Sequence, residues 1–266
     1  MAYNYRGKTA LVTGASSGIG VEFSNRLAAR GANLVLVARR KERLQELAKV
    51  MQAKHKVEVT VISVDLSEFG SAASLVKQLK RKKLSVDVLI NNAGFGTIGH
   101  FNNMDEAKIS EQIRLNVLTL VELTRGLLPE MVSRRSGVVV NIASTAAYQP
   151  VPYMAVYAAT KSFVLSFTEA LWGELRGTGV HALTLSPGGT KTEFFEVASN
   201  GKTGDGFGKM QTVDEVVEVA MKALDASTPP PSVISGGVNK MMATSGRFVS
   251  RKTVLSIATK LFKPKD

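Results

Sequence analysis

The chain has 266 residues, of which 44% are hydrophobic, 6% are aromatic and none is cysteine, and it carries a formal net charge of +12. This length is enough for one α/β domain with a full core, and the lack of cysteine excludes disulfides, thiolate metal sites and cysteine nucleophiles. No segment reaches the roughly 18 apolar residues of a membrane span. No secretory signal is visible at the N-terminus, so we expect a cytoplasmic protein, and we expect no metal site.

Short runs of apolar, β-branched residues alternate with longer helical patterns along most of the chain. Such repetition, with nearly continuous apolar strands, is typical of a parallel sheet covered by helices on both faces. The sequence therefore predicts the α/β class and a doubly wound parallel sheet of about seven strands. The predicted strands are residues 9–13, 33–38, 57–64, 86–90, 138–142 and 181–185, with a weaker candidate at 233–234.

Two long helical regions follow the fourth and fifth predicted strands. The first covers residues 105–135, with an interruption expected near Pro129, and the second covers residues 153–176, which end before the glycines at 177 and 179. Residues 200–209 are rich in glycine and polar residues, and this pattern predicts a mobile loop over a site. We divide the chain into a single domain of residues 1–235 and a basic, amphipathic helical extension of residues 236–266.

A glycine-rich junction joins the first predicted strand to the next helix. It reads Thr13-Gly14-Ala15-Ser16-Ser17-Gly18-Ile19-Gly20. Glycines at such a junction let the backbone approach an anion, and the helix N-terminus offers free N–H groups. The spacing is G-x-x-x-G-x-G, so taken alone it is only moderately specific for a dinucleotide.

The same letters also fit a serine hydrolase. Residues 14–18 read G-x-S-x-G, the nucleophile elbow, which likewise joins a strand to a helix. A hydrolase needs a histidine in a loop above the sheet, and of His55, His100 and His181 only His100 lies in a predicted loop. The hydrolase is the weaker of the two hypotheses.

Two arginines, Arg39 and Arg40, end the second predicted strand. A dinucleotide site often carries a carboxylate here to bind the ribose 2′-hydroxyl, whereas an arginine accommodates a 2′-phosphate. The pattern favours NADP(H) over NAD(H), with Arg39 as the phosphate ligand. The alternative, a solvated start to the next helix, fits Arg40 better than Arg39.

The remaining predicted strands also end in small or polar residues. Because ligands of open parallel sheets bind at the carboxyl ends of the strands, this succession is more informative than any one motif. The residues are Asp65 and Leu66 after the third strand, Asn92, Ala93 and Gly94 after the fourth, Ser144 after the fifth, and Pro187 and Gly188 after the sixth.

Tyr157 and Lys161 are four residues apart on a predicted helix and therefore share a face. Lowering a tyrosine pKa from about 10 toward 7 needs about 4 kcal/mol of preferential stabilisation of the phenolate. A nearby ammonium contributes to this in a partly dry site. Ser144, after a neighbouring strand, is placed to hold a substrate oxygen. The Y-x-x-x-K spacing alone is weak evidence, because such pairs also occur by chance on helices.

Residues 7–192 resemble the short-chain dehydrogenase/reductase family. The resemblance is carried, in order, by Thr13-Gly14-x-x-x-Gly18-Ile19-Gly20, Asn91-Asn92-Ala93-Gly94, Asn116, Ser144, Tyr157-x-x-x-Lys161 and Pro187-Gly188. It implies a Rossmann-like fold with strand order 3-2-1-4-5-6-7. It also implies hydride transfer between nicotinamide C4 and a carbonyl or secondary alcohol carbon.

The resemblance implies a role for each site residue. Tyr157 would donate the proton in reduction, Ser144 would polarise the substrate oxygen, Lys161 would lower the pKa of Tyr157 and bind the nicotinamide ribose, and Asn116 would support a water relay. The implied cofactor contacts are Gly14, Ser16, Ser17, Gly18, Ile19, Gly20, Arg39, Asp65, Leu66, Asn92, Ala93, Gly94, Tyr157, Lys161, Pro187, Gly188, Thr190 and Thr192.

The chain departs from the family pattern in two places. Gly189-Thr190 stands where the family often has Pro-Val, and the V-D-G-G type of ending that closes many family tetramers is missing. A homodimer through the helices that contain Asn116 and Tyr157 is therefore expected more than a homotetramer.

The C-terminal segment holds half of the net charge, because residues 240–266 contain seven basic residues and one acidic residue. On a helix, Val254, Ala258, Leu261 and Phe262 share one face. Such a segment could pack on the same or a partner subunit, cover an apolar pocket, or lie on a membrane. We expect packing on a subunit, with peripheral membrane contact as the less favoured alternative.

These observations predict an NADP(H)-dependent carbonyl reductase or alcohol dehydrogenase. The segment after the sixth strand carries Phe194, Phe195, Val197, Phe207 and Met210, which favours an apolar ketone, an oxoacyl chain or a steroid-like substrate. The alternative is a non-catalytic dinucleotide-binding or scaffold protein with a basic surface. Nucleic acid is not an expected partner, because no nucleic-acid-binding module is present.

Overall fold

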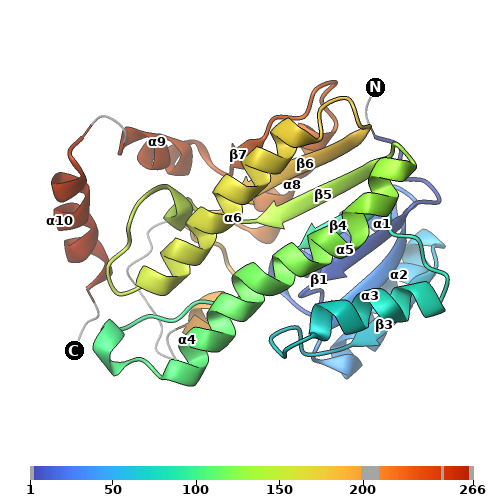
Figure 1. The fold of residues 1–266 in the computed structure, drawn as a ribbon, viewed down its shortest axis with the longest axis horizontal. Helices are drawn as coiled ribbons and strands as arrows, with labels where there is room; N and C mark the ends of the chain where they lie inside the picture. Colours follow the sequence, from blue (N-terminus) through green and yellow to red (C-terminus); the bar gives the residue numbers. More distant parts are fainter. Residues whose placement is uncertain (1–2, 199–209, 247–248, 264–266) are drawn as a thin grey trace.

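The protein folds around one seven-stranded parallel sheet with the order β3-β2-β1-β4-β5-β6-β7 (Figure 1). The computed structural model describes residues 3–198, 210–246 and 249–263. All seven predicted strands are present, and the predicted strand order is confirmed. The strands are β1 (Thr9–Thr13), β2 (Asn33–Ala38), β3 (Val59–Ser63), β4 (Val88–Asn91), β5 (Gly137–Ile142), β6 (Val180–Ser186) and β7 (Ser232–Ile234).

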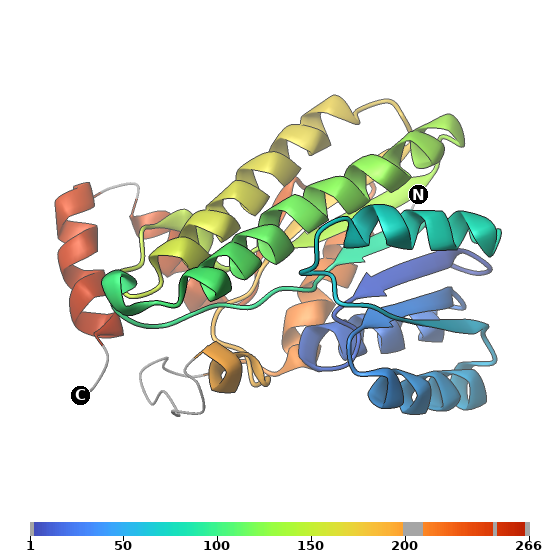
Figure 2. The same cartoon turned by 60° about the horizontal axis from the view of Figure 1, so that its bottom comes forward.

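Helices cover both faces of this sheet, which explains why its strands are apolar on both sides. One face packs against α1 (Gly18–Ala29), α2 (Lys41–His55) and α8 (Val213–Leu224). The other packs against α3 (Ser71–Arg81), α5 (Leu120–Ser133) and α6 (Ala155–Glu174). The two views in Figures 1 and 2 show these layers.

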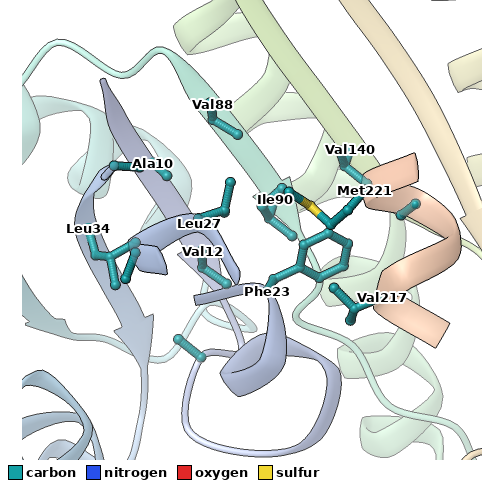
Figure 3. Close-up of a cluster of buried hydrophobic side chains, with 14 of the residues drawn as sticks. Ala10, Val12, Phe23, Leu27, Leu34, Val88, Ile90, Val140, Val217 and Met221 are labelled. Carbon is teal, nitrogen blue, oxygen red and sulfur yellow. The ribbon is translucent and has the colours of Figure 1, made fainter. Parts of the chain in front are cut away.

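Successive residues of β1 point into different cores, as expected for a strand with a period of two. Val12 belongs to the core under α1 and α8, whereas Leu11 belongs to the core under α3 and α5. Figure 3 shows the first core, where Phe23 of α1 lies beside Val217 and Met221 of α8. Phe23 is fully buried, so the helix that follows the glycine-rich loop is held firmly against the sheet.

The predicted interruption of residues 105–135 at Pro129 is wrong. Pro129 lies inside α5, and the helical path changes instead at a π-helical turn, η2 (Arg114–Thr119), between α4 (Glu106–Ile113) and α5. The proline removes one backbone donor, which the long helix accommodates. The π turn inserts an extra residue per turn, a geometry often found at functional sites, and it buries Asn116 and Thr119.

Three shorter elements complete the end of the sheet where the strands terminate. They are η1 (Phe101–Asn103), η3 (Thr145–Tyr148) and α7 (Phe194–Ala198). Beyond α6 the chain turns at Gly177 and Gly179, which have φ values of +79° and +82° and stop the helix as predicted. In the described ranges, no helix is both long enough and apolar enough to cross a membrane.

The C-terminal helices α9 (Gly237–Ser245) and α10 (Arg251–Phe262) lie outside the sheet, at one end of the molecule (Figures 1 and 2). Ala258 is 2% exposed and Phe262 is partly buried, so part of the predicted inner face of α10 packs on the same subunit. Leu261 does not belong to that face, since it is 54% exposed. The division at residue 235 stays a prediction.

Candidate active site

A cavity of about 410 Å³ lies at the carboxyl ends of the strands, and six successive strand-to-helix connections contribute to it. It brings together nearly all of the predicted site residues. Those that line it are Gly14, Ser16, Ser17, Gly18, Ile19, Arg39, Asp65, Leu66, Asn92, Ala93, Gly94, Ser144, Tyr157, Lys161, Pro187, Gly188, Thr190 and Thr192. Gly20 and Asn116 are not among the lining residues and lie behind the wall.

The glycine-rich loop has a backbone that other residues adopt poorly. Gly14 and Gly18 have φ values of +63° and +55°. A side chain at Gly14 would lie 2.7 Å from the Asn92 amide nitrogen, and one at Gly18 would lie 2.8 Å from the Thr192 side chain. Both positions therefore require glycine, because of their positive φ values and because a Cβ atom would collide with these neighbouring residues.

Thr13 and Asn92 fix this loop to the next strand end. The Thr13 hydroxyl accepts hydrogen bonds from the backbone N–H groups of Asn92 and Ala93, both at 3.0 Å. The Asn92 amide donates back to the carbonyls of Thr13 and Gly14, at 2.9 and 3.2 Å. Gly20 serves packing, because a Cβ atom there would collide with the Gly14 carbonyl.

Arg40 takes part in the site, which corrects its interpretation as a solvated helix start. Its guanidinium donates two hydrogen bonds to the Ser16 hydroxyl, at 3.0 and 3.1 Å, and pairs with Glu193 at 2.6 Å. Arg39 is more open: its side chain is 68% exposed and lies 3.5 Å from Asp65. Both arginines line the cavity, so two guanidinium groups are available to an anion at the end of β2.

Glu193 was missed by the sequence analysis. Its two carboxylate oxygens pair with Arg40 and with Arg43, each at 2.6 Å. These two arginines, chiefly through their hydrogen bonds, hold the pKa of Glu193 below its usual range. The sequence signal for Glu193 is an acidic residue directly after Thr192. It is weak, because the arginines that pair with Glu193 are about 150 residues away in sequence.

Asp65 is fixed in orientation by its neighbours. Partial burial alone would raise its pKa, but hydrogen bonds from Ser67 and the charge of Arg39 together hold it below the usual value. The Ser67 hydroxyl and N–H donate to one carboxylate oxygen at 2.6 and 2.9 Å. Asp65 is therefore ionised and oriented beside Arg39.

Tyr157, Lys161 and Ser144 converge at the other end of the cavity. Tyr157 and Lys161 are 8% and 6% exposed, and the Lys161 ammonium lies 5.7 Å from the centroid of the tyrosine ring. The ammonium donates to the Ile142 carbonyl at 2.8 Å. Since Ile142 ends β5 and Ser144 follows it, one strand end positions two members of the group.

Burial dominates the ionisation of this pair. Desolvation raises the pKa of Tyr157 to about 12, and interaction with the Ser144 hydroxyl acts in the opposite direction. Desolvation also lowers the pKa of Lys161 to about 8. At neutral pH both groups are mostly protonated, so the site holds a neutral phenol beside a cation.

Asn116 connects this group to the loop after β4. Its side-chain oxygen accepts from the Phe95 N–H at 3.1 Å, and its amide donates to the Phe95 carbonyl and to the Thr160 hydroxyl. A side chain at Gly94 would lie 2.9 Å from the Asn116 oxygen and 3.5 Å from the Lys161 nitrogen. Asn116 is therefore a buried brace next to Lys161, and its role in a water relay stays a prediction.

The serine hydrolase hypothesis is wrong. The Ser16 hydroxyl accepts from Arg40 rather than from a histidine. His100 packs edge-on against Tyr153, His55 hydrogen-bonds to Asn25, and His181 is the second residue of β6. None of the three histidines meets the elbow, so the nucleophile has no base.

An apolar wall lies beside the Tyr157 hydroxyl end of the cavity. Phe194 contacts the Tyr157 ring at a centroid distance of 5.2 Å. Phe195 and Val197 line the cavity as predicted, Met210 does not, and Phe207 lies outside the described residues. The sequence analysis missed further apolar lining residues, namely Val151, Met154 and, from α10, Phe262.

The donor set fits a nicotinamide dinucleotide phosphate. Gly14 and Gly18 line the cavity at the point where α1 begins, and a helix N-terminus favours a phosphate group. Asp65 and two arginines lie at the end where a ribose phosphate would be recognised. In the described part of the chain, no cluster of histidine and acidic residues could hold a metal ion.

Comparisons with known proteins agree with this geometry. A family model described as short chain dehydrogenase matches residues 8–202. The very-long-chain 3-oxoacyl-CoA reductase-B of Danio rerio is 37% identical over 186 residues, which cover 68% of this chain and 59% of that protein. The NADP-dependent 3-hydroxy acid dehydrogenase of Schizosaccharomyces pombe is 36% identical over 73% of this chain and 76% of its own length.

A solved structure extends the similarity to almost the whole fold. A short-chain dehydrogenase from Sphingobium yanoikuyae in complex with NADPH superposes with a TM-score of 0.80 at 32% identity, covering 94% of this chain and 95% of that one. By sequence, the chain spans 61%, 59% and 63% of the length of three curated relatives it matches.

Proposed function

The chain belongs to the short-chain dehydrogenase family, and we propose that it is an NADP(H)-dependent oxidoreductase acting on an apolar carbonyl or secondary alcohol. The observation that carries this proposal is the convergence of Ser144, Tyr157 and Lys161 on the cavity that the glycine-rich loop also lines. A structural glycine turn or a chance Y-x-x-x-K pair would not bring these residues together.

The chain's own residues perform the binding and the proton transfer. Gly14, Gly18 and the α1 N-terminus would hold the pyrophosphate, while Arg39 and Arg40 would hold the 2′-phosphate. NADP(H), when bound, supplies or accepts the hydride at its nicotinamide ring. In the direction of reduction, the Ser144 and Tyr157 hydroxyls donate hydrogen bonds to the carbonyl oxygen, and Tyr157 gives up its proton as the carbon receives the hydride.

Lys161 makes this proton transfer less costly. The phenolate that Tyr157 leaves behind is buried, and burial alone opposes it. The Lys161 ammonium is also buried, so its attraction for the phenolate is weakly screened by water. The Ile142 carbonyl holds that ammonium on the tyrosine side of the cavity.

The apolar wall supports an apolar substrate. Phe194, Phe195, Val151, Met154 and Phe262 provide the surface next to the reacting tyrosine. Two relatives are a very-long-chain 3-oxoacyl-CoA reductase of Danio rerio and, at 34% identity, a 7beta-hydroxysteroid dehydrogenase of Clostridium sardiniense, and both names refer to large, mainly apolar compounds. We propose an oxoacyl, steroid-like or bulky ketone substrate for this chain.

A panel assay tests the proposal. The purified protein is mixed with NADPH and with ketones that range from short aliphatic to steroid-like, and NADPH absorbance is followed. We expect oxidation of NADPH with the bulky apolar ketones and slower oxidation with NADH. A protein that binds NADPH but turns over no carbonyl or alcohol would support the non-catalytic alternative instead.

We also propose self-association as a homodimer or homotetramer. Ile113, Leu118 and Phe163, on the helices that carry Asn116 and Tyr157, are 46%, 42% and 42% exposed. Burying them between copies would remove apolar surface from water. Light scattering coupled to size exclusion chromatography distinguishes monomer, dimer and tetramer.

A further inference from the structure

Large apolar side chains gather on the outside of α9, α10 and their connection. Of the fourteen large hydrophobic residues exposed in the described chain, seven lie between residues 238 and 261. A short segment therefore holds half of the exposed apolar side chains, a concentration that single scattered residues do not explain. Leu255 lines a hollow that it shares with residues of η3 and α6. We call the other six the C-terminal apolar face; its members are Val238, Met241, Met242, Val249, Ile257 and Leu261.

The large apolar side chains of α9 point away from the protein. Val238, Met241 and Met242 have the spacing i, i+3, i+4 and are 67%, 64% and 51% exposed. Ala243, the buried residue of this helix, lies on the opposite side of the helix. The apolar stripe of α9 is thus turned outward, whereas a helix that only packs on its own subunit turns its apolar stripe inward.

α10 divides its apolar residues between the protein and the outside. Ala258 and Phe262, four residues apart, pack inward. Ile257 and Leu261, also four apart and each 54% exposed, lie on the flank of that inner strip. The sequence favoured packing on the same or on a partner subunit. Packing on the same subunit accounts for the first pair and leaves the second exposed.

The charged residues of the C-terminal segment are all basic up to residue 265. Residues 236–265 contain seven basic residues and no acidic residue. In the described part, the basic residues of this segment lie on α9 and α10 or directly after α10, and all are exposed: Lys240, Arg251, Lys252, Lys260 and Lys263. A partner of the C-terminal apolar face must therefore accept apolar side chains and carry negative charge.

Three kinds of occupant can be compared on this basis. A second copy meeting the same face would place basic residues against basic residues. Nucleic acid would meet the charge but gives no place to Val238, Met241 or Ile257. A bilayer with anionic lipid accepts apolar side chains below its headgroups and attracts lysine and arginine at its surface.

We propose that the C-terminal apolar face docks the protein on the surface of a membrane that carries anionic lipid. The helices lie on the surface and do not span it. Docking of this kind has a consequence that rests on the proposed function: Phe262 of α10 also lines the active-site cavity, so the membrane surface would lie beside the apolar wall. An apolar substrate could then pass from the bilayer to Tyr157 without crossing much water.

The test uses the full-length protein and measures its partition onto vesicles by flotation. The vesicles are phosphatidylcholine alone or phosphatidylcholine mixed with phosphatidylglycerol. We expect the protein to float with the anionic vesicles, to stay in solution with the neutral ones, and to be released by high salt. A wild-type protein that stays in solution with anionic vesicles overturns the proposal.

Matched variants separate this face from the rest of the basic surface. Met241→Glu adds one acid at an exposed apolar position, and Val50→Glu does the same on α2, where Val50 is 54% exposed. Lys252→Glu with Lys260→Glu reverses two charges on α10, and Lys49→Glu with Lys54→Glu reverses two on α2. We expect each α10 or α9 variant to lower the partition by at least about tenfold and each α2 control to change it by less than about threefold.

Two further outcomes would overturn the proposal. If the C-terminal variants and the α2 controls lost vesicle binding equally, the net charge of the protein, and not this face, would hold the protein on the vesicles. A change of oligomeric mass in Met241→Glu, measured by light scattering without lipid, would assign the face to a second copy. Because none of these readouts is an enzyme assay, membrane docking can fail while the proposed oxidoreductase activity stands, and the reverse.

Discussion

The glycine-rich loop and the C-terminal helices, of which α10 contributes Phe262 to the active-site cavity, are held in different ways. The loop lies between strands that are fully buried, and Thr13 and Asn92 bind its backbone with several hydrogen bonds. α9 and α10 each bury a single alanine, and their large side chains are mostly exposed. The buried region holds the proposed catalytic and cofactor-binding groups, while the exposed one contributes Phe262 to the apolar wall of the cavity.

This difference indicates which region of the molecule tolerates amino-acid substitutions. A side chain added at Gly14, Gly18 or Gly94 would lie within 3 Å of a neighbouring side chain. A substitution on the exposed side of α9 meets solvent. The first region is therefore expected to control chemistry and cofactor binding, and the second to control which substrate arrives and how.

The largest effect is expected at the centre of the buried region. Tyr157→Phe removes the proposed proton donor, and general acid catalysis contributes about 10²–10⁴-fold, so kcat for ketone reduction should fall by about a thousandfold. NADPH affinity, measured by fluorescence titration, should change little because the ring stays in place. Tyr153→Phe, a neighbouring tyrosine whose ring faces His100, is the control and should keep its activity. Wild-type turnover in Tyr157→Phe would remove the assigned acid.

The phosphate end of the cavity gives the next largest effect. Arg39→Asp replaces a cation by an anion beside Asp65, so the Kd for NADPH should rise by about a hundredfold while the Kd for NADH changes by less than about threefold. Isothermal titration with both cofactors measures the two constants. Equal losses for NADPH and NADH would contradict the assignment of Arg39 to the 2′-phosphate.

Sequence reasoning succeeded where local pattern and tertiary structure agree. The strands at 9–13 and 33–38 were predicted to the residue, because continuous apolar runs bounded by turn residues leave little choice. The site residues on strand ends followed, since a parallel sheet collects those ends at one edge.

It failed where the answer depends on distant partners. Pro129 is a strong breaker signal, yet the packing of α5 against α3 and the sheet overrides it, and the real irregularity lies at Asn116. Arg40 and Glu193 carry no motif, and only the fold brings them together. Helical spacing predicts that Leu261 shares a face with Ala258, but the part of α10 that packs on the protein is too narrow to bury Leu261.

Lys161 gives a pH-dependent test of how dry the buried region is. Its pKa is about 8 in the folded protein against an ordinary value of 10.5, so between these values the unfolded chain binds more protons and stability rises with pH. The free energy of unfolding should increase by about 1.5 kcal/mol between about pH 8 and about pH 9.5, relative to Lys161→Met. Urea denaturation at the two pH values measures this. Lys49→Met, an exposed lysine, should follow the wild type, and a wild type that follows Lys161→Met would show a hydrated Lys161.

A substitution of Glu193 tests whether its ion pairs with the arginines strengthen or weaken NADPH binding. Its carboxylate pairs with Arg40 and Arg43, and an incoming phosphate would need the Arg40 guanidinium. Glu193→Gln should therefore bind NADPH about threefold to tenfold more tightly and leave the Kd for NADH unchanged. Glu196→Gln, an exposed acid on α7, is the matched control. Weaker NADPH binding in Glu193→Gln would mean that the carboxylate positions Arg40 for the phosphate.

The smallest effect is expected where the two regions meet. Phe262 is the residue of α10 that lines the cavity, and it packs against the cluster of Val151, Met154 and Tyr157. Phe262→Ala should raise KM for bulky apolar ketones by about threefold to tenfold, because apolar contact area with the substrate is lost. It should leave kcat and the KM for a short aliphatic ketone nearly unchanged, since no group that touches the reacting oxygen has moved. Leu261→Ala, one residue earlier and exposed, should change neither constant for a substrate supplied in solution. If Phe262→Ala lowered kcat for small and large ketones alike, α10 would belong with the buried region, and the contrast between the two would not hold.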